Sequence, residues 1–157
     1  MIALNEIDLK IISLLQTDAR MQNAALAKEL GMAPSAVLER VRKLEEKGII
    51  KSYTTNINPS SVNLKLLAFI SIKSKAGPGD QDAAEYLKKM PEVLELHNIA
   101  GDDCYIIKVR ATDTQSLAHF MRNSLGKVPG LISTRTTIVL ETLKEDNYLP
   151  IPKNADE

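Results

Sequence analysis

The chain has 157 residues, 44% hydrophobic and 25% charged, which is typical of a soluble globular protein with one domain or two small ones. Its 20 basic and 20 acidic side chains cancel, which argues against a histone-like protein that binds DNA through bulk positive charge. One cysteine excludes an intramolecular disulfide and fits a cytoplasmic protein, and the sequence predicts neither a signal peptide nor a membrane span.

The first predicted element is a helix over residues 5–16. Asn5 is a suitable N-cap, and acidic Glu6 and Asp8 suit the positive end of the helix dipole. Apolar residues at helical spacing predict a buried face made of Ile7, Ile11, Leu14 and Leu15.

Two short helices joined by a tight turn follow, the first over residues 23–30. Its packing residues are expected to be Ala24, Leu26, Ala27 and Leu30. Gly31 can close this helix in a left-handed conformation, and Pro34 suits the first position of the next one. The second helix ends at Gly48 and has a stripe predicted to be buried, formed by Val37, Val41 and Leu44.

The opposite face of that second helix is polar and carries Ser35, Glu39, Arg42, Lys43 and Glu46, with Arg40 at its flank. A short helix, a tight turn and a second helix with an arginine-bearing face form the pattern of a helix-turn-helix, whose second helix enters the DNA major groove. The strand-like residues 49–55 after it predict a wing.

Residues 56–64 are rich in Asn, Ser and Pro and predict a linker to a second domain. Beyond it, the pattern predicts strands over 65–74, 92–100, 104–111 and 131–142, with helices over 80–90 and 114–125. This β-α-β-β-α-β order is that of a ferredoxin-like α/β sandwich, so the fold class is α+β. One sheet face is bare in such a monomer, which predicts a dimer through the sheets.

The order of residues resembles the Lrp/AsnC, or feast/famine, family of transcriptional regulators. The resemblance covers about residues 4–150 and rests on Asp8, the Asp18-Ala19-Arg20 turn, Ala27, Gly31, Pro34 to Val37, Arg40, Val41, Leu44-Glu45, Gly48 to Ile50, Gly101-Asp102, Tyr105 and Leu140. It implies a winged helix-turn-helix domain over residues 1–55 and a sensing and oligomerisation domain over 65–145. Composition predicts the linker over 56–64 and a tail over 146–157 that is mobile past Pro152.

The resemblance further implies binding to double-stranded operator DNA, assembly of dimers into tetramers or octamers, and control by a small effector, usually an amino acid. The expected DNA-contacting residues are Ser35, Ala36, Glu39, Arg40, Arg42 and Lys43. The alternative for them is a solvated helix face with an ion pair from Glu39 to Lys43.

The effector pocket is expected at the loop after the second strand of the sensing domain, with part of the last strand contributed by a neighbouring subunit. The expected residues are Gly101, Asp102, Asp103, Cys104, Tyr105, Thr134 and Thr136. Asp102 or Asp103 would hold an ammonium group. The alternatives are a turn-forming role for Asp102 and a core position for Tyr105, and Cys104 is expected to be a small packed residue. Many family members carry an acidic residue where this chain has Cys104, and often a serine where it has Ala33.

One cysteine and two distant histidines lack metal-ligand spacing, so we expect no metal. We also expect no cofactor and no enzymatic activity, because the predicted DNA-reading helix and the Gly101-Asp102 loop are both present. Two other functions remain open at this point: an architectural, nucleoid-type protein with little effector control, and an enzyme resembling sirohaem decarboxylase subunits.

Overall fold

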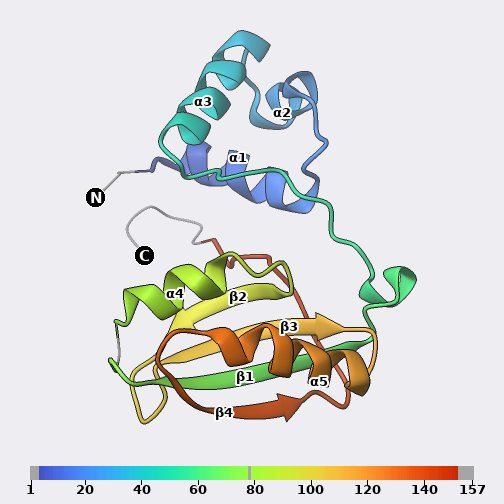
Figure 1. The fold of residues 1–157 in the computed structure, drawn as a ribbon. Helices are drawn as coiled ribbons and strands as arrows, with labels where there is room; N and C mark the ends of the chain where they lie inside the picture. Colours follow the sequence, from blue (N-terminus) through green and yellow to red (C-terminus); the bar gives the residue numbers. More distant parts are fainter. Residues whose placement is uncertain (1–3, 78, 152–157) are drawn as a thin grey trace. The chain divides into compact units, whose positions relative to one another are not determined.

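The computed structural model describes residues 4–77 and 79–151, and the chain divides into two compact units (Figure 1). The helical unit comprises Met1–Asn56 together with Lys144–Glu157, and the sheet unit comprises Ile57–Leu143. No helix in the described part of the chain is long and apolar enough to cross a membrane.

The first helix of the helical unit, α1 (Glu6–Thr17), begins with a capping box. The Asn5 side chain accepts a hydrogen bond from the Asp8 backbone N–H at 2.9 Å, and the Asp8 carboxylate accepts one from the Asn5 N–H at 3.5 Å. The predicted N-cap is therefore confirmed. Of the predicted apolar face, Ile11 and Leu15 are buried, and Ile7 and Leu14 pack against them half-buried.

The helix pair consists of α2 (Asn23–Leu30) and α3 (Pro34–Glu46), with the predicted stripe of α3 buried against α1 and α2. Gly31 adopts the expected left-handed conformation with φ 64° and closes α2. Ala24 was expected to pack but is exposed. Leu26, two residues further, is buried, and residues two apart lie on opposite sides of a helix with about 3.6 residues per turn.

The strand predicted over residues 49–55 is absent from the structure. Gly48, with φ 67°, lets the backbone fold back so that Ile49 N–H donates to the Leu44 carbonyl at 2.9 Å, which closes α3. A strand needs a neighbour for its N–H and C=O groups, and no strand pairs with this segment among the residues that the structure describes.

The sheet unit contains the predicted strands and helices in the predicted order. They are β1 (Leu66–Ser74), α4 (Gln81–Lys88), β2 (Val93–Asn98), β3 (Tyr105–Ala111), α5 (Thr114–Asn123) and β4 (Leu131–Ile138). The strands pair antiparallel in the order β2-β3-β1-β4, as in a ferredoxin-like sandwich (Figure 1). The last strand ends four residues before the predicted end. Short 3-10 turns at Pro59–Val62 and Leu125–Lys127 complete the unit. Pro78, between Gly77 and Gly79 in the segment after β1, lies outside the described residues.

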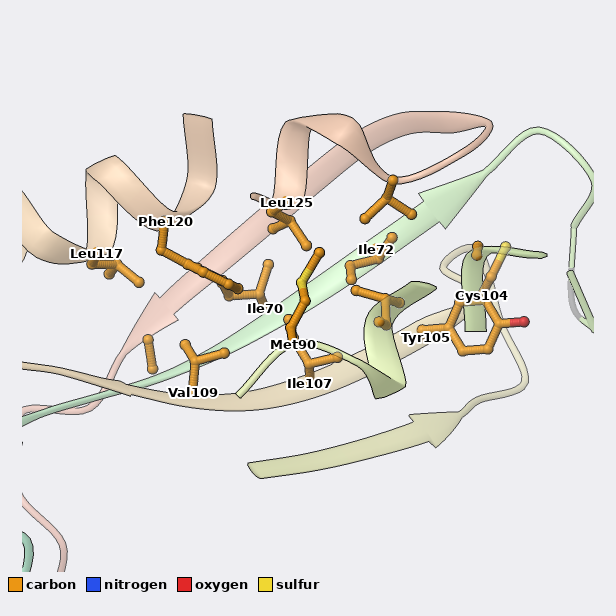
Figure 2. Packing of buried hydrophobic residues seen from close by; sticks show 14 residues of the cluster. Ile70, Ile72, Met90, Cys104, Tyr105, Ile107, Val109, Leu117, Phe120 and Leu125 are labelled. Atoms are coloured by element: carbon orange, nitrogen blue, oxygen red, sulfur yellow. The ribbon is translucent and has the colours of Figure 1, made fainter. Parts of the chain in front are cut away.

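Both helices cover the same face of the sheet. Leu87 of α4 belongs to one buried cluster with residues of α5 and the sheet. Phe120 of α5, Ile70 of β1 and Ile107 of β3 lie in that cluster (Figure 2). The alternation of side chains along a strand places Phe69, Ser71 and the neighbouring Lys108 on the other face. That face is mixed rather than apolar, because Lys108 forms an ion pair with Glu95 at 3.0 Å.

The end of the chain returns to the helical unit. The Gln16 side-chain amide donates to the Leu149 carbonyl at 3.1 Å and accepts from the Leu149 N–H at 2.8 Å. The hydroxyls of Ser13 and Tyr148 lie 3.5 Å apart. Residues 148 and 149 are therefore held on α1. The mobility predicted past Pro152 concerns residues outside the described range.

Candidate functional site

The exposed face of α3 carries the charges expected of a helix that contacts DNA. Arg42 Nε lies 3.0 Å from the Glu46 carboxylate, and Lys43 Nζ lies 2.8 Å from that of Glu39. The hydrogen bond and charge of Lys43 lower the pKa of Glu39 from its ordinary value. All four side chains are exposed, and exposed ion pairs are weak, so phosphate groups can compete for both cations.

Arg40 lies apart from this face, at the flank where α3 meets α1. Its Nη1 donates to the Asp8 carboxylate at 3.0 Å, and 32% of the arginine side chain and 17% of the aspartate side chain are exposed. Ala36 is half-buried on the same flank, whereas Ser35 is exposed. Of the six predicted DNA-contacting residues, Arg40 and Ala36 therefore lie half-buried on the flank beside α1. The other four are exposed: Ser35, Glu39, Arg42 and Lys43.

A groove of about 470 Å³ runs along this flank. Its polar lining comes from the start of α1 and from α3 with its end, and consists of Asn5, Asp8, Glu39, Arg40, Lys43 and Lys47. Sequence reasoning did not identify Lys47 or the contact of Asp8 with Arg40. The two residues of that pair are 32 positions apart, so no periodic pattern in the sequence indicates their proximity.

Tyr53 ties the segment after α3 back to that helix, because its hydroxyl donates to the Glu45 carboxylate at 2.8 Å. Burial, followed by this hydrogen bond and the carboxylate charge, raises the pKa of Tyr53 to about 12.

We expect a phenolate absorbance titration of the folded protein to contain a component near pH 12 that Tyr53→Phe removes. The folded state favours the protonated phenol, so this group's contribution to stability is complete below its ordinary pKa of 10.0 and is lost as the pH rises through about 12. If the component removed by Tyr53→Phe titrates at pH 10, the hydroxyl is not held by Glu45 in solution.

In the sheet unit, the loop between β2 and β3 is the second candidate site. Gly101 has φ 139°, a conformation that side chains disfavour, and Gly101 and Asp102 are exposed. Asp103 is half-buried, and its carboxylate accepts a hydrogen bond from Arg135 of β4 at 2.5 Å. The loop therefore presents a carboxylate and a guanidinium side by side.

Cys104 and Tyr105, which follow the loop, belong to the core rather than to its surface (Figure 2). The Cys104 sulfur lies 3.5 Å from the Ser74 N–H, and the Tyr105 hydroxyl donates to the Asp80 carbonyl at 2.6 Å. Burial is the main cause that raises the pKa of Tyr105. Cys104 is therefore packed in the core, as expected, and Tyr105 has the core position given as its alternative to a place in the effector pocket.

Thr134 and Thr136 are half-buried on the helix-covered side of β4, where the Thr136 hydroxyl donates to the Met121 sulfur at 3.6 Å. Arg135, between them, points to the opposite face, since neighbouring side chains alternate along a strand. The structure brings Arg135 to Asp103 and keeps the two threonines away from that pair. No cluster of three His, Cys, Asp or Glu side chains able to hold a metal occurs within residues 4–77 and 79–151.

Each of the two units contains a segment that matches a known protein family. Residues 4–51 match a winged helix-turn-helix DNA-binding family, and residues 67–149 match the Lrp/AsnC ligand binding domain. The chain belongs to the Lrp/AsnC family of DNA-binding transcriptional regulators, in which a helix-turn-helix is joined to a ligand-binding domain.

Its relatives match nearly the whole chain. The HTH-type transcriptional regulator FL11 of Pyrococcus horikoshii is 40% identical over 150 residues, covering 96% of this chain and 98% of that protein. The leucine-responsive regulatory protein of Escherichia coli is 36% identical over 150 residues, covering 94% and 92%. A transcriptional regulator of Neisseria meningitidis, solved in complex with L-Met, superposes with a TM-score of 0.86 at 32% identity, covering 94% and 96%.

Proposed function

We propose that a free amino acid controls DNA binding by this regulator and that α3 is the helix that reads the duplex. The observation that carries the effector proposal is the Asp103–Arg135 pair at the exposed Gly101 loop. The exposed cations of α3 support the proposal for DNA. The proposed role is regulatory rather than catalytic, in the cytoplasm with the DNA, and it needs neither a cofactor nor a metal.

The chemistry of the loop suits an amino acid. A zwitterion carries an ammonium that competes with Arg135 for Asp103, and a carboxylate that competes with Asp103 for Arg135. The backbone at Gly101 lacks a side chain, so a ligand can approach its N–H groups closely. The complex of the Neisseria relative with L-Met supports this ligand class. The amino acid differs between the Escherichia coli and Neisseria relatives, since one is named leucine-responsive and the other was solved with L-Met.

Self-assembly is part of the proposal. The outer sheet face combines half-buried Phe69 and Ile106 with charged side chains, which suits a dimer interface between two sheets. Further assembly of dimers into tetramers or octamers would place a second subunit beside each effector loop.

A thermal-shift screen with the twenty amino acids tests the effector proposal. One amino acid, or a few of similar structure, should raise the melting temperature, because a ligand that binds only the native state at 100 times its Kd stabilises it by about 2.7 kcal/mol. Asp103→Asn should abolish the shift, since the ammonium loses its charged partner. Asp102→Asn, an identical change one residue away at an exposed position, should retain it.

The effector proposal fails if no amino acid shifts the melting temperature at millimolar concentration while the protein still binds a duplex. The assignment of the effector site to this loop is wrong if the amino acid raises the melting temperature of Asp103→Asn and Asp102→Asn as much as that of the unchanged chain.

A further inference from the structure

The Asp8 carboxylate makes contacts in two elements at once. One oxygen accepts the Asn5 N–H that starts α1, and the other accepts the Arg40 guanidinium of α3 at 3.0 Å. Because the capping box fixes the carboxylate at the start of α1, the position of the arginine is fixed as well. The long side chain of Arg40 is thus ordered before any ligand arrives.

The flank on which Arg40 lies determines what it can reach. Successive residues of a helix are rotated by about 100°, so Arg40 lies roughly 60° from the buried Val37 and far from the centre of the exposed face at Glu39. If the exposed face enters the major groove, this flank faces the wall of the groove, where the phosphates run. On the protein, Lys43 and Lys47 line the 470 Å³ groove together with Arg40.

Arg40 retains the capacity to bind a phosphate there. A guanidinium has five N–H donors, and its hydrogen bond to Asp8 comes from Nη1. The side chain is 32% exposed, so part of it reaches solvent. Phosphates accept such N–H groups in a fixed geometry, which makes the orientation of the guanidinium important.

We propose that Asp8 is a positioning residue for DNA binding, which holds Arg40 so that its free N–H groups contact a backbone phosphate beside the recognition helix. The proposal rests on α3 being that helix. It assigns Arg40 to affinity and register, and leaves sequence discrimination to the exposed face around Arg42. Asp8 itself does not contact the duplex.

The direction in which Asp8→Asn changes DNA affinity distinguishes a positioning role from a simple effect of charge. Asp8→Asn removes a negative charge close to the DNA-binding surface, and by charge alone it should tighten binding to a polyanion. If Asp8 positions Arg40, the same substitution should weaken binding although the protein has become more positive. Asparagine keeps an oxygen that can accept the Asn5 N–H, so the start of α1 is retained.

The experiment uses the full chain and two duplexes of about 30 base pairs, one selected by the unchanged protein from a random library and one of scrambled sequence. Affinity is measured against salt concentration, at a temperature where circular dichroism shows each variant folded. Asp8→Asn should weaken binding to both duplexes by about fivefold or more, with their affinity ratio unchanged. The matched control is Glu6→Gln, the same charge change at an exposed residue of the same helical turn, which should bind as tightly or more tightly.

Variants at Arg40 test the proposal even if Asp8→Asn does not fold. Arg40→Lys keeps the charge but lacks the guanidinium fork, so it should weaken binding to both duplexes similarly, whereas Arg40→Ala should also reduce the slope of log affinity against log salt by about 0.9. Unchanged or tighter DNA binding by Asp8→Asn overturns the proposal. If Asp8→Asn is unfolded, unchanged DNA binding by Arg40→Lys overturns it instead. Failure of the unchanged chain to select any duplex, or full affinity of Arg42→Ala, would instead refute the DNA-reading role proposed for α3.

Discussion

Replacing Leu26 with alanine should destabilise the helical unit by about 2–5 kcal/mol, because the side chain is removed from a packed core and leaves a cavity. Leu26 is 1% exposed and packs with Ile11 of α1 and Val37 of α3. Hydrogen exchange of the amides in α1–α3, followed by mass spectrometry, measures the effect. A loss of about 3 kcal/mol accelerates exchange through global opening by roughly a hundredfold.

The matched control is Leu38→Ala, the same change at a residue of α3 that is 54% exposed. Because its side chain gains little from folding, we expect a change within about 0.5 kcal/mol. Equal acceleration by the two substitutions would show that the three helices do not share the core described here.

The second large effect concerns DNA. Arg42→Ala should cost about 1–3 kcal/mol of binding free energy to a selected duplex and relax its sequence preference, if Arg42 contacts a base edge as proposed. Lys43→Ala should weaken binding to all duplexes and reduce the salt slope by about 0.9, which is the loss of one phosphate contact. Both measurements are made by fluorescence anisotropy across a range of salt concentrations.

Lys88→Ala in α4 is the control for Lys43→Ala. Lys88 is exposed and pairs with Glu85 at 2.6 Å, much as Lys43 pairs with Glu39 at 2.8 Å. The two substitutions remove the same charge and a similar ion pair, so any difference reports the location of the lysine. A salt slope reduced equally by both would show that α3 contributes only to the net charge of the chain.

The sequence was most informative where a structure is specified within a few residues. The cap at Asn5, the left-handed Gly31 and the first-turn Pro34 each depend on local backbone chemistry, and all three were predicted. The strand predicted over residues 49–55 does not form, because a strand depends on a partner elsewhere in the chain. Residues 49–55 have a strand-like composition, but among the described residues no other strand pairs with them.

The candidate sites required information that spacing does not contain. The sequence identified the loop around Gly101 and part of β4, but the register that turns Arg135 toward Asp103, and Thr134 and Thr136 away from it, is visible only in the folded sheet. A shift of one residue along a strand exchanges the two faces. Likewise, Arg40 was identified as a cation of α3, while its partner on α1 depends on how two helices cross.

The hydrogen bonds of Gln16 with Leu149 make the helical unit discontinuous in sequence, assembled from residues at both ends of the chain. The sheet unit is consequently an insertion whose two ends both lead into the part that carries α3. A fragment that stops at Asn56 lacks a peptide segment that α1 holds, and an affinity tag at the C-terminus lies close in sequence to that contact. Expression plans for the DNA-binding part should therefore retain residues 144–151 or supply them as a separate peptide.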